Sequence, residues 1–255
     1  TPCKRGDTLF GKRKELFLSM TEGYVFLPKG KIVSCIPEKI PLDNDFGFLI
    51  GIYLAEGLTT KTYVSIANNN VIIRQKVEQW CDRQGITYRT VEWKGNQKRK
   101  NISSYGLTIH SVLLARLLAN VCGTGSANKK VPEFSYTAPK EFIEGLIDGY
   151  ISGNGTISKR DGYIVASFVS ENMIHGISFL LSYFGVFGKI SEIRIKNINM
   201  ESGDIKPVHT LSICNGYAKR FANKINLTEK NKQTLLENIT KTKKYKHDLG
   251  LYMQE

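Results

Sequence analysis

The chain has 255 residues, a formal net charge of +13 and a pI near 9.4. This length allows one large domain or two halves, and 41% hydrophobic residues exclude wholesale disorder. The excess of 36 Lys and Arg over 23 Asp and Glu indicates a polyanionic partner, because it raises a positive potential over much of the surface. Charge alone therefore favours a nucleic-acid-binding protein over a merely basic one.

The cysteines and the hydropathy pattern argue against a secreted or membrane protein. The five cysteines have no CxxC or zinc-type spacing and are expected to be reduced thiols of an intracellular protein, in cytoplasm, nucleus or organelle. The longest apolar run, residues 46–55, is about half of what a membrane span needs. No signal peptide is expected at the start, and no membrane association is predicted.

An internal repeat organises the sequence. Residues 1–45 precede it as an N-terminal extension, an intein remnant or an accessory DNA-contacting hairpin, with a turn near Lys29-Gly30. The nonapeptide LIGIYLAEG at residues 49–57 returns as IDGYISGNG at residues 147–155, 98 positions later. Two more matches pair residues 63–70 with 165–172 and residues 105–121 with 209–225, at offsets of 102 and 104. Three matches in order at nearly one spacing indicate a duplication.

Each copy reads as helix, two strands, helix, two strands, helix. Apolar periodicity predicts helices at 71–84 and 173–184, and alternation predicts strands at 86–94, 102–110, 189–196 and 208–214. The expected domains are a first repeat at 46–128, a linker and second repeat at 129–226, and a basic C-terminal helix or tail at 227–255. The fold class is α+β: tandem αββαββα repeats related by a pseudo-twofold axis, with two antiparallel sheets and helices on their outer face.

The nonapeptides contain glycines where a helix pattern disfavours them. Glycine costs about 1 kcal/mol inside a helix, so Gly51 and Gly149 indicate two helices packed closely about the pseudo-twofold axis. Gly57 and Gly155 are expected to end these helices, which puts Glu56 and Asn154 side by side at the helix ends. A carboxylate is unfavourable there, and a divalent cation reverses that penalty.

With these features the sequence resembles a single-chain LAGLIDADG homing endonuclease with two motif copies, of the intein-associated subtype. The resemblance covers nearly all of residues 45–226 and implies a metal-dependent endodeoxyribonuclease, a monomer whose sheets form a saddle on double-stranded DNA. Mg²⁺, for which Ca²⁺ or Mn²⁺ can substitute, is implied at Glu56 and Asn154. It also implies catalytic lysines at Lys130, in the block KKVP, and at Lys232 or Lys230; read without the resemblance, each is an exposed loop residue.

Asn154 departs from the family pattern, because asparagine has no negative charge and cannot act as a general base. An engineered substitution, a natural nicking or slow variant, and a degenerate binder all fit. The chain is expected to bind a long asymmetric site and to cleave it poorly or nick it. The alternative is a non-cleaving DNA-binding protein or an RNA-binding intron maturase of the same fold. No P-loop, GxSxG, HExxH or GxGxxG motif supports another enzyme class.

Strand alternation predicts which side chains face DNA. Val91, Trp93, Ile193 and Ile195 are expected to pack on the helices, and the intervening polar residues to face outward into a major groove. Two basic hairpin tips, 94–100 and 196–206, are expected to meet phosphates. The predicted DNA-binding residues are Lys61, Tyr63, Ser65, Thr90, Glu92, Lys94, Lys98, Arg99, Lys100, Ser104, Thr108, Lys159, Arg160, Ser167, Glu192, Arg194, Lys196, Lys206, Thr210 and Ser212. The lead-in at residues 36–43 also suggests an intein origin.

Overall fold

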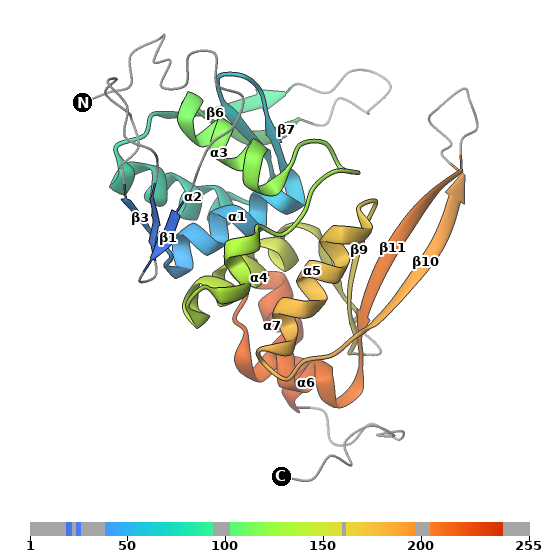
Figure 1. Cartoon of the computed structure of the whole chain (residues 1–255). Helices are drawn as coiled ribbons and strands as arrows, with labels where there is room; N and C mark the ends of the chain where they lie inside the picture. Colours follow the sequence, from blue (N-terminus) through green and yellow to red (C-terminus); the bar gives the residue numbers. More distant parts are fainter. Residues whose placement is uncertain are drawn as a thin grey trace.

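The computed structural model describes residues 19–21, 24–26, 39–93, 103–159, 162–196 and 205–241 (Figure 1). A short three-stranded antiparallel sheet comes first, made of β1 (Ser19–Thr21), β2 (Tyr24–Phe26) and β3 (Lys39–Pro41). The first repeat comprises α1 (Asn44–Glu56), β4 (Gly57–Thr59), β5 (Val64–Ala67), α2 (Val71–Gln84), β6 (Tyr88–Trp93), β7 (Ser104–Ile109) and α3 (Val112–Cys122). The turn expected near Lys29-Gly30 lies outside the described residues.

The second repeat has the same element order. After the 3₁₀ helix η2 (Glu133–Thr137) it comprises α4 (Lys140–Asn154), β8 (Gly155–Ile157), β9 (Ile164–Phe168), α5 (Glu171–Ser182), β10 (Lys189–Lys196), β11 (Ile205–Ile213) and α6 (Asn215–Lys224). Helix α7 (Lys230–Lys241) follows it. The sheets have the orders β4-β5-β7-β6 and β8-β9-β11-β10, and all their neighbouring strands are antiparallel. The α+β class and the duplicated αββαββα order are thus confirmed.

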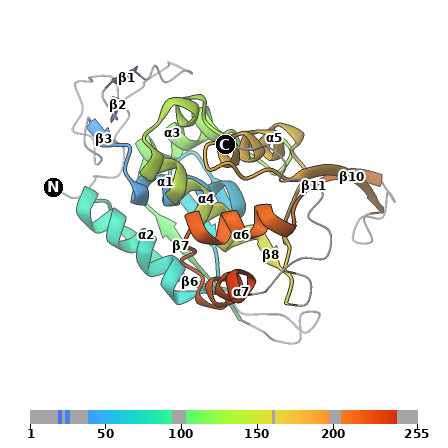
Figure 2. The same ribbon diagram turned by 90° about the horizontal axis from the view of Figure 1, so that it is seen from below.

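Helices α1 and α4 pack against each other at the centre of the molecule (Figures 1 and 2). Glycines make this close packing possible: a Cβ at Gly51 would overlap the carbonyl oxygen of Leu146, and one at Gly149 would overlap that of Phe48. Gly47 and Gly145 meet the opposite backbone in the same way. The predicted glycine-mediated helix pairing is confirmed, with two more glycines than the sequence pattern had indicated.

The remaining helices cover one face of each sheet and enclose a common apolar core. Its largest fully buried side chains include Trp80 of α2, Tyr53 of α1 and Phe142 of α4. The β10–β11 hairpin extends beyond the helices, as both views show (Figures 1 and 2). No described helix is long and apolar enough to cross a membrane.

The helix boundaries follow from local capping. The Asn70 side chain accepts hydrogen bonds from the backbone N–H groups of residues 72 and 73, so α2 covers the predicted range of 71–84. The Ser170 hydroxyl caps α5 in the same way, which moves its start two residues ahead of the predicted 173. Gly57 and Gly155 end α1 and α4 as predicted, but in an extended rather than a left-handed conformation.

Three cysteines lie in the described part of the chain. Cys81 and Cys122 are buried, Cys214 is exposed, and none of the three forms a disulfide. Burial raises the pKa of the Cys81 thiol to about 12, so this side chain stays a neutral thiol and acts as a core residue.

Candidate active site and nucleic-acid interface

The C-terminal ends of α1 and α4 bring Glu56 and Asn154 together. The two helices meet so closely that a Cβ added at Gly153, the residue before Asn154, would lie 3.4 Å from Cγ of Glu56. Both side chains are only partly buried, so a ligand can reach them. The structure therefore brings the two predicted metal positions to one place between the repeats.

Lys129 lies at the end of α1 and caps it. Its side chain is buried, and Nζ donates to the carbonyl oxygens of Tyr53 at 2.6 Å, Leu54 at 3.1 Å and Gly57 at 2.8 Å. A lysine here satisfies carbonyls that the helix leaves unpaired and complements the negative end of the dipole. Burial lowers the pKa of Lys129 to about 8, although the nearby charge of Glu56 opposes that shift.

Lys232 occupies the equivalent position at the end of α4. Its Nζ donates to the carbonyl oxygens of Ile151 at 2.9 Å and Ser152 at 2.6 Å. Burial lowers the pKa of Lys232, and the charges of Glu229 and Glu56 oppose this effect. Each motif helix therefore ends at a partly or fully buried lysine, and the two lysines follow the pseudo-twofold symmetry.

Glu56 lies within the field of both lysines. Burial raises the pKa of its carboxyl group, while Lys232 and Lys129 lower it by smaller amounts. The charged groups of this centre are thus the ammonium groups of Lys129 and Lys232 and the carboxylates of Glu56 and Glu229. The two cations are the groups that can attract an anionic ligand such as a phosphodiester.

Two buried carboxylates fix Lys232 in place. Glu229 accepts hydrogen bonds from the backbone N–H of Lys232 at 2.7 Å and from the side-chain amide of Asn70 at 3.1 Å. Asp148 accepts from the backbone N–H and the hydroxyl of Thr228, at 2.7 Å and 2.6 Å. The start of α7 is thereby tied both to the first repeat and to α4, so these carboxylates position the lysine.

Asn154 is turned toward the neighbouring strand β9. Its side-chain nitrogen donates to the carbonyl oxygen of Ser167 at 2.7 Å, which leaves its oxygen as the group available to a ligand. An aspartate cannot make this hydrogen bond, because it has no donor when ionised. The amide therefore determines the side-chain orientation as well as the charge at this position.

The oxygen atoms of Glu56 and Asn154 fit Mg²⁺ as part of a shell. Mg²⁺ prefers hard oxygen ligands and is often held by one or two carboxylates plus substrate phosphates and water. One carboxylate and one neutral amide oxygen meet this requirement only when a phosphate is present. Among the described residues, no group of three or more His, Cys, Asp or Glu side chains could hold a metal ion alone.

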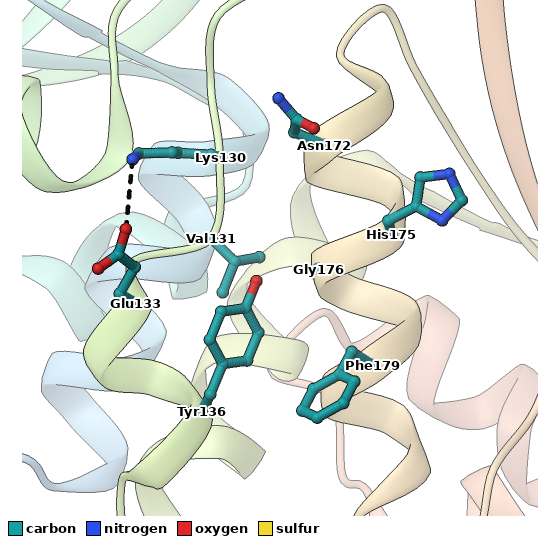
Figure 3. A pocket seen from close by; sticks show the side chains of 8 residues that line it. All are labelled: Lys130, Val131, Glu133, Tyr136, Asn172, His175, Gly176 and Phe179. Atoms are coloured by element: carbon teal, nitrogen blue, oxygen red, sulfur yellow. Dashed lines mark ion pairs between the residues drawn. The ribbon is translucent and has the colours of Figure 1, made fainter.

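Lys130 points away from the carbonyls that Lys129 caps. Its Nζ pairs with Glu133 at 3.9 Å, and its side chain is about half exposed. Figure 3 shows the pair at the rim of a pocket of about 620 Å³ between η2 and α5, which Tyr136 and Phe179 also line. Of the two adjacent lysines, the structure thus brings Lys129 rather than Lys130 to the helix end. Lys230, the alternative to Lys232, is the first residue of α7 and is exposed.

The predicted sheet faces of β6 were inverted. Thr90 pairs with the buried Leu107, and its hydroxyl donates to Glu78 of α2 at 3.2 Å. Cross-strand partners share a face, so Thr90 and Glu92 lie on the helix side. The prediction that Trp93 packs on the helices was therefore wrong. The opposite, outer face of β6 carries Arg89, Val91 and Trp93.

The same inversion occurs in β10. Glu192 pairs with the buried His209, whereas Ile193 pairs with Val208 on the outer face. Ile193 is 51% exposed, so its predicted packing on the helices was also wrong. Arg194 follows Glu192 on the helix-side register and bonds to its carboxylate at 3.2 Å. The hairpin extends beyond the helices, so polar residues on this side remain exposed.

The predicted hydroxyl positions do lie on the outer faces. Ser65 pairs with Thr108, and the hydroxyl groups of Ser167 and Thr210 lie 3.1 Å apart. The register also puts Ser104 and Ser212 on these faces. Thr210 is nearly covered, with 8% exposure, Ser167 is exposed, and the other four are partly exposed.

The side chains of three of the other predicted DNA-binding residues lie in the part of the chain that the structure describes. Lys61 and Lys159 are exposed in the β4–β5 and β8–β9 turns, and the Tyr63 ring lies 6.5 Å from that of His110. Lys94, Lys98, Arg99, Lys100 and Arg160 fall outside the described residues, and so do the side chains of Lys196 and Lys206.

Sequence reasoning missed Lys129, Arg89 and Lys189. Lys189 pairs with Ser212 on the outer face, at the position equivalent to Arg89 opposite Thr108. Both residues are exposed. Arg89 and Lys189 could have been found from the sequence if the inward and outward faces had been assigned by alternation from Leu107, which is buried. The apolar residues of β6 gave the wrong face. No sequence signal separates Lys129 from Lys130.

Comparisons with known proteins assign the family. The LAGLIDADG-like domain matches residues 43–122 and 141–226, which are the two repeats. The chain belongs to this family. A relative, the DNA-directed RNA polymerase subunit Rpo1C of Methanocaldococcus jannaschii, is 37% identical over 80% of the chain but only 22% of its own length. The chain therefore spans about a fifth of that relative's length.

Solved structures share the fold. The homing endonuclease I-DmoI in complex with DNA and Ca superposes with a TM-score of 0.52 at 15% identity, covering 72% of this chain and 90% of that one. Full-length DUF199/WhiA from Thermatoga maritima gives a TM-score of 0.52 at 10% identity, covering 82% and 63%. These likenesses establish the LAGLIDADG architecture, which hosts more than one kind of protein.

Proposed function

We propose that the chain is a site-specific endonuclease that binds double-stranded DNA and cleaves it incompletely. The observation that carries this proposal is the arrangement of Glu56 between Lys129 and Lys232 at the paired helix ends. It offers an oxygen ligand for a divalent metal and two cations for a phosphodiester at one place. The structures of I-DmoI in complex with DNA and with Mn or Ca support a divalent metal in this proposal.

In this proposal the chain's own residues bind and orient the scissile phosphate. Glu56 and the Asn154 oxygen would hold Mg²⁺, which when bound would polarise the phosphodiester and an attacking water. Lys129 and Lys232, whose ammonium groups are bonded to helix carbonyls, act through their charge rather than by contact and stabilise the negative charge that develops on the phosphate. Glu229 keeps Lys232 in place by fixing the first turn of α7.

Asn154 limits the reaction to incomplete cleavage. The second repeat supplies a neutral amide where the first supplies a carboxylate, and that amide is bonded to Ser167. Only the half of the centre built on Glu56 retains a charged ligand and a group able to accept a proton. We therefore expect one strand to be cut faster than the other.

The outer faces of the two sheets form the DNA interface in this proposal. Equivalent positions carry different residues, such as Arg89 and Lys189 or Trp93 and Ile193, so the target site is asymmetric. The protein acts as a monomer, because both halves of the saddle belong to one chain. We expect the protein to act inside the cell, where double-stranded DNA lies.

The relatives support our proposal that the chain originates from an inserted segment. Proteins of unrelated roles share the matched region: an RNA polymerase subunit, a DNA polymerase of Thermococcus hydrothermalis and a probable translation initiation factor IF-2. The match occupies 22%, 9% and 16% of their lengths. A segment common to such different hosts is most simply an intein-associated endonuclease domain.

A selection from a random duplex library tests the proposal. Bound duplexes are recovered, sequenced, and incubated with the protein in Mg²⁺, and each strand is labelled separately. A long non-palindromic consensus with faster cutting of one strand is expected. Absence of any enriched duplex would refute DNA recognition, and enrichment with no cutting in Mg²⁺ or Mn²⁺ would leave the second candidate, a non-cleaving DNA-binding protein. The Asn154–Ser167 bond favours that candidate.

A further inference from the structure

Two large apolar side chains are exposed at equivalent positions of the two sheets. Trp93 at the end of β6 is 39% exposed, and Ile193 in β10 is 51% exposed. They are 100 residues apart, close to the repeat offset, and both lie on the face opposite the helices. Gly106 leaves the space that the Trp93 ring occupies, since a Cβ there would meet its atoms at 2.5 Å. The Trp93 position is thus built to hold an apolar ring on the outer face, and Ile193 presents an apolar side chain at the equivalent position.

Cations flank both residues on the same face. Arg89 precedes Trp93 by four positions, and Lys189 precedes Ile193 by four, so each pair spans about 13 Å along its strand. The four side chains share the outer faces with the hydroxyls of Thr108 and Ser212. Each apolar residue therefore lies among cations and hydroxyls, on a chain whose net charge is +13. Such a surface fits a polyanion that carries an apolar group at a defined place.

The major groove of DNA offers such a group. Among the base edges there, the 5-methyl of thymine is the apolar feature, and the remaining edges are hydrogen-bond donors and acceptors. A sheet can enter this groove, while cations on its strands reach the phosphates. Ribonucleic acid fits less well, because uracil lacks the methyl group and the major groove of an RNA helix is too narrow for side chains.

We propose that Trp93 and Ile193 each contact a thymine 5-methyl group, one in each half of the target site. This inference rests on the proposed function, since it names the bases that the same interface selects. It identifies two specificity-determining residues, and it predicts A·T pairs at two positions placed equivalently about the centre of the site.

Single replacement of thymine by deoxyuridine tests the inference, because it removes the methyl group and keeps base pairing. Each thymine of the selected duplex is replaced in turn, and the Kd is measured for the parent chain, Trp93→Ala and Ile193→Ala. Loss of one methyl contact is expected to weaken binding by the parent about fourfold. Trp93→Ala should remove the sensitivity at one thymine, and Ile193→Ala at one thymine in the other half, as in a double-mutant cycle.

Phe179→Ala is the matched control, because Phe179 is an aromatic residue on α5 with 52% exposure, away from both sheets. It should keep both thymine sensitivities. If the parent selects a site and neither sheet variant changes the sensitivity to deoxyuridine, the methyl contact is wrong while DNA recognition stands. If the parent selects no site, the proposed function and this inference fall together.

Discussion

The ammonium group of Lys129 donates a hydrogen bond to the carbonyl oxygen of Tyr53 at 2.6 Å. A residue of the linker between the repeats thereby reaches the end of the first motif helix, one turn from Glu56. Lys232, which lies more than a hundred residues after Lys129, donates in the same way to a carbonyl oxygen at the end of the second motif helix. The centre therefore depends on segments outside the motif itself.

Lys129→Met is expected to reduce cleavage in Mg²⁺ by roughly a hundredfold, because it removes a buried positive charge that acts on the Glu56 centre. Lys130→Met is the neighbouring control and should change cleavage less than about threefold, since Lys130 pairs with Glu133 at the pocket rim. Single-turnover rates on the selected duplex measure both. Equal losses in the two variants would show that the bulk charge of the linker matters rather than the buried ammonium. Thermal unfolding identifies any variant that is simply destabilised.

Glu56→Gln is expected to abolish detectable cleavage while the Kd for DNA changes less than about threefold. The amide keeps the size of the side chain and removes the charged metal ligand. Glu144→Gln serves as the control, because Glu144 lies on α4 and pairs with Lys140 away from the helix end. Gel-shift and cleavage assays in parallel separate the two effects. Full activity of Glu56→Gln would contradict the proposal that Glu56 holds a metal needed for cleavage.

Much of the fold was readable from the sequence because the repeat constrains it. The nonapeptide glycines, such as Gly51, predicted the helix pair, and that pairing fixes the pseudo-twofold arrangement of the remaining elements. The β6 faces were not readable. Val91 and Trp93 look like core residues by alternation, yet the outer face of this sheet presents apolar groups and so reverses the usual inside-outside rule.

The site was only half readable for a related reason. Glu56 and Asn154 follow from the repeat, since backbone geometry puts both at a helix end. The choice between Lys129 and Lys130 depends on which side chain the linker turns inward. That is decided by tertiary packing: the backbone carbonyl of Lys129 accepts the Ser170 hydroxyl, while its side chain caps α1. Neither contact has a local signature.

Asn154→Asp is expected to speed cleavage of the slower strand by on the order of ten- to a hundredfold. The aspartate loses the hydrogen bond to Ser167 and turns from that carbonyl oxygen toward the metal position, where it adds a negative charge. Asn154→Ala also loses the bond but adds no ligand, so it should give no gain. Strand-specific labelling measures the effect. If both variants cleave the slower strand faster, the hydrogen bond to Ser167 is the cause of the slow cleavage and the missing charge is not.

Gly51→Ala is expected to lower the free energy of unfolding by about 3 kcal/mol, because its methyl group would overlap the Leu146 carbonyl oxygen. Gly125→Ala is the comparison: no atom lies near its Cβ, and only its positive φ of 75° is unfavourable, which costs about 1 kcal/mol. Urea unfolding followed by circular dichroism measures both. A similar small loss in both variants would mean that α1 and α4 can separate at little cost.

The pH dependence of kcat/KM should be bell-shaped, because kcat/KM reports groups of the free enzyme. Glu56 must lose its proton to hold the metal, and its pKa is raised by burial, so activity should rise at a higher pH than for an ordinary glutamate. Lys129 must keep its proton, and its pKa of about 8 should make activity fall above that pH. Lys129→Arg stays charged throughout this range, so it should lose the falling limb if it retains activity. If Lys129→Arg is active and its profile still falls at the same pH, the falling limb belongs to another group. The neighbouring candidate is Lys232, whose pKa is also lowered by burial.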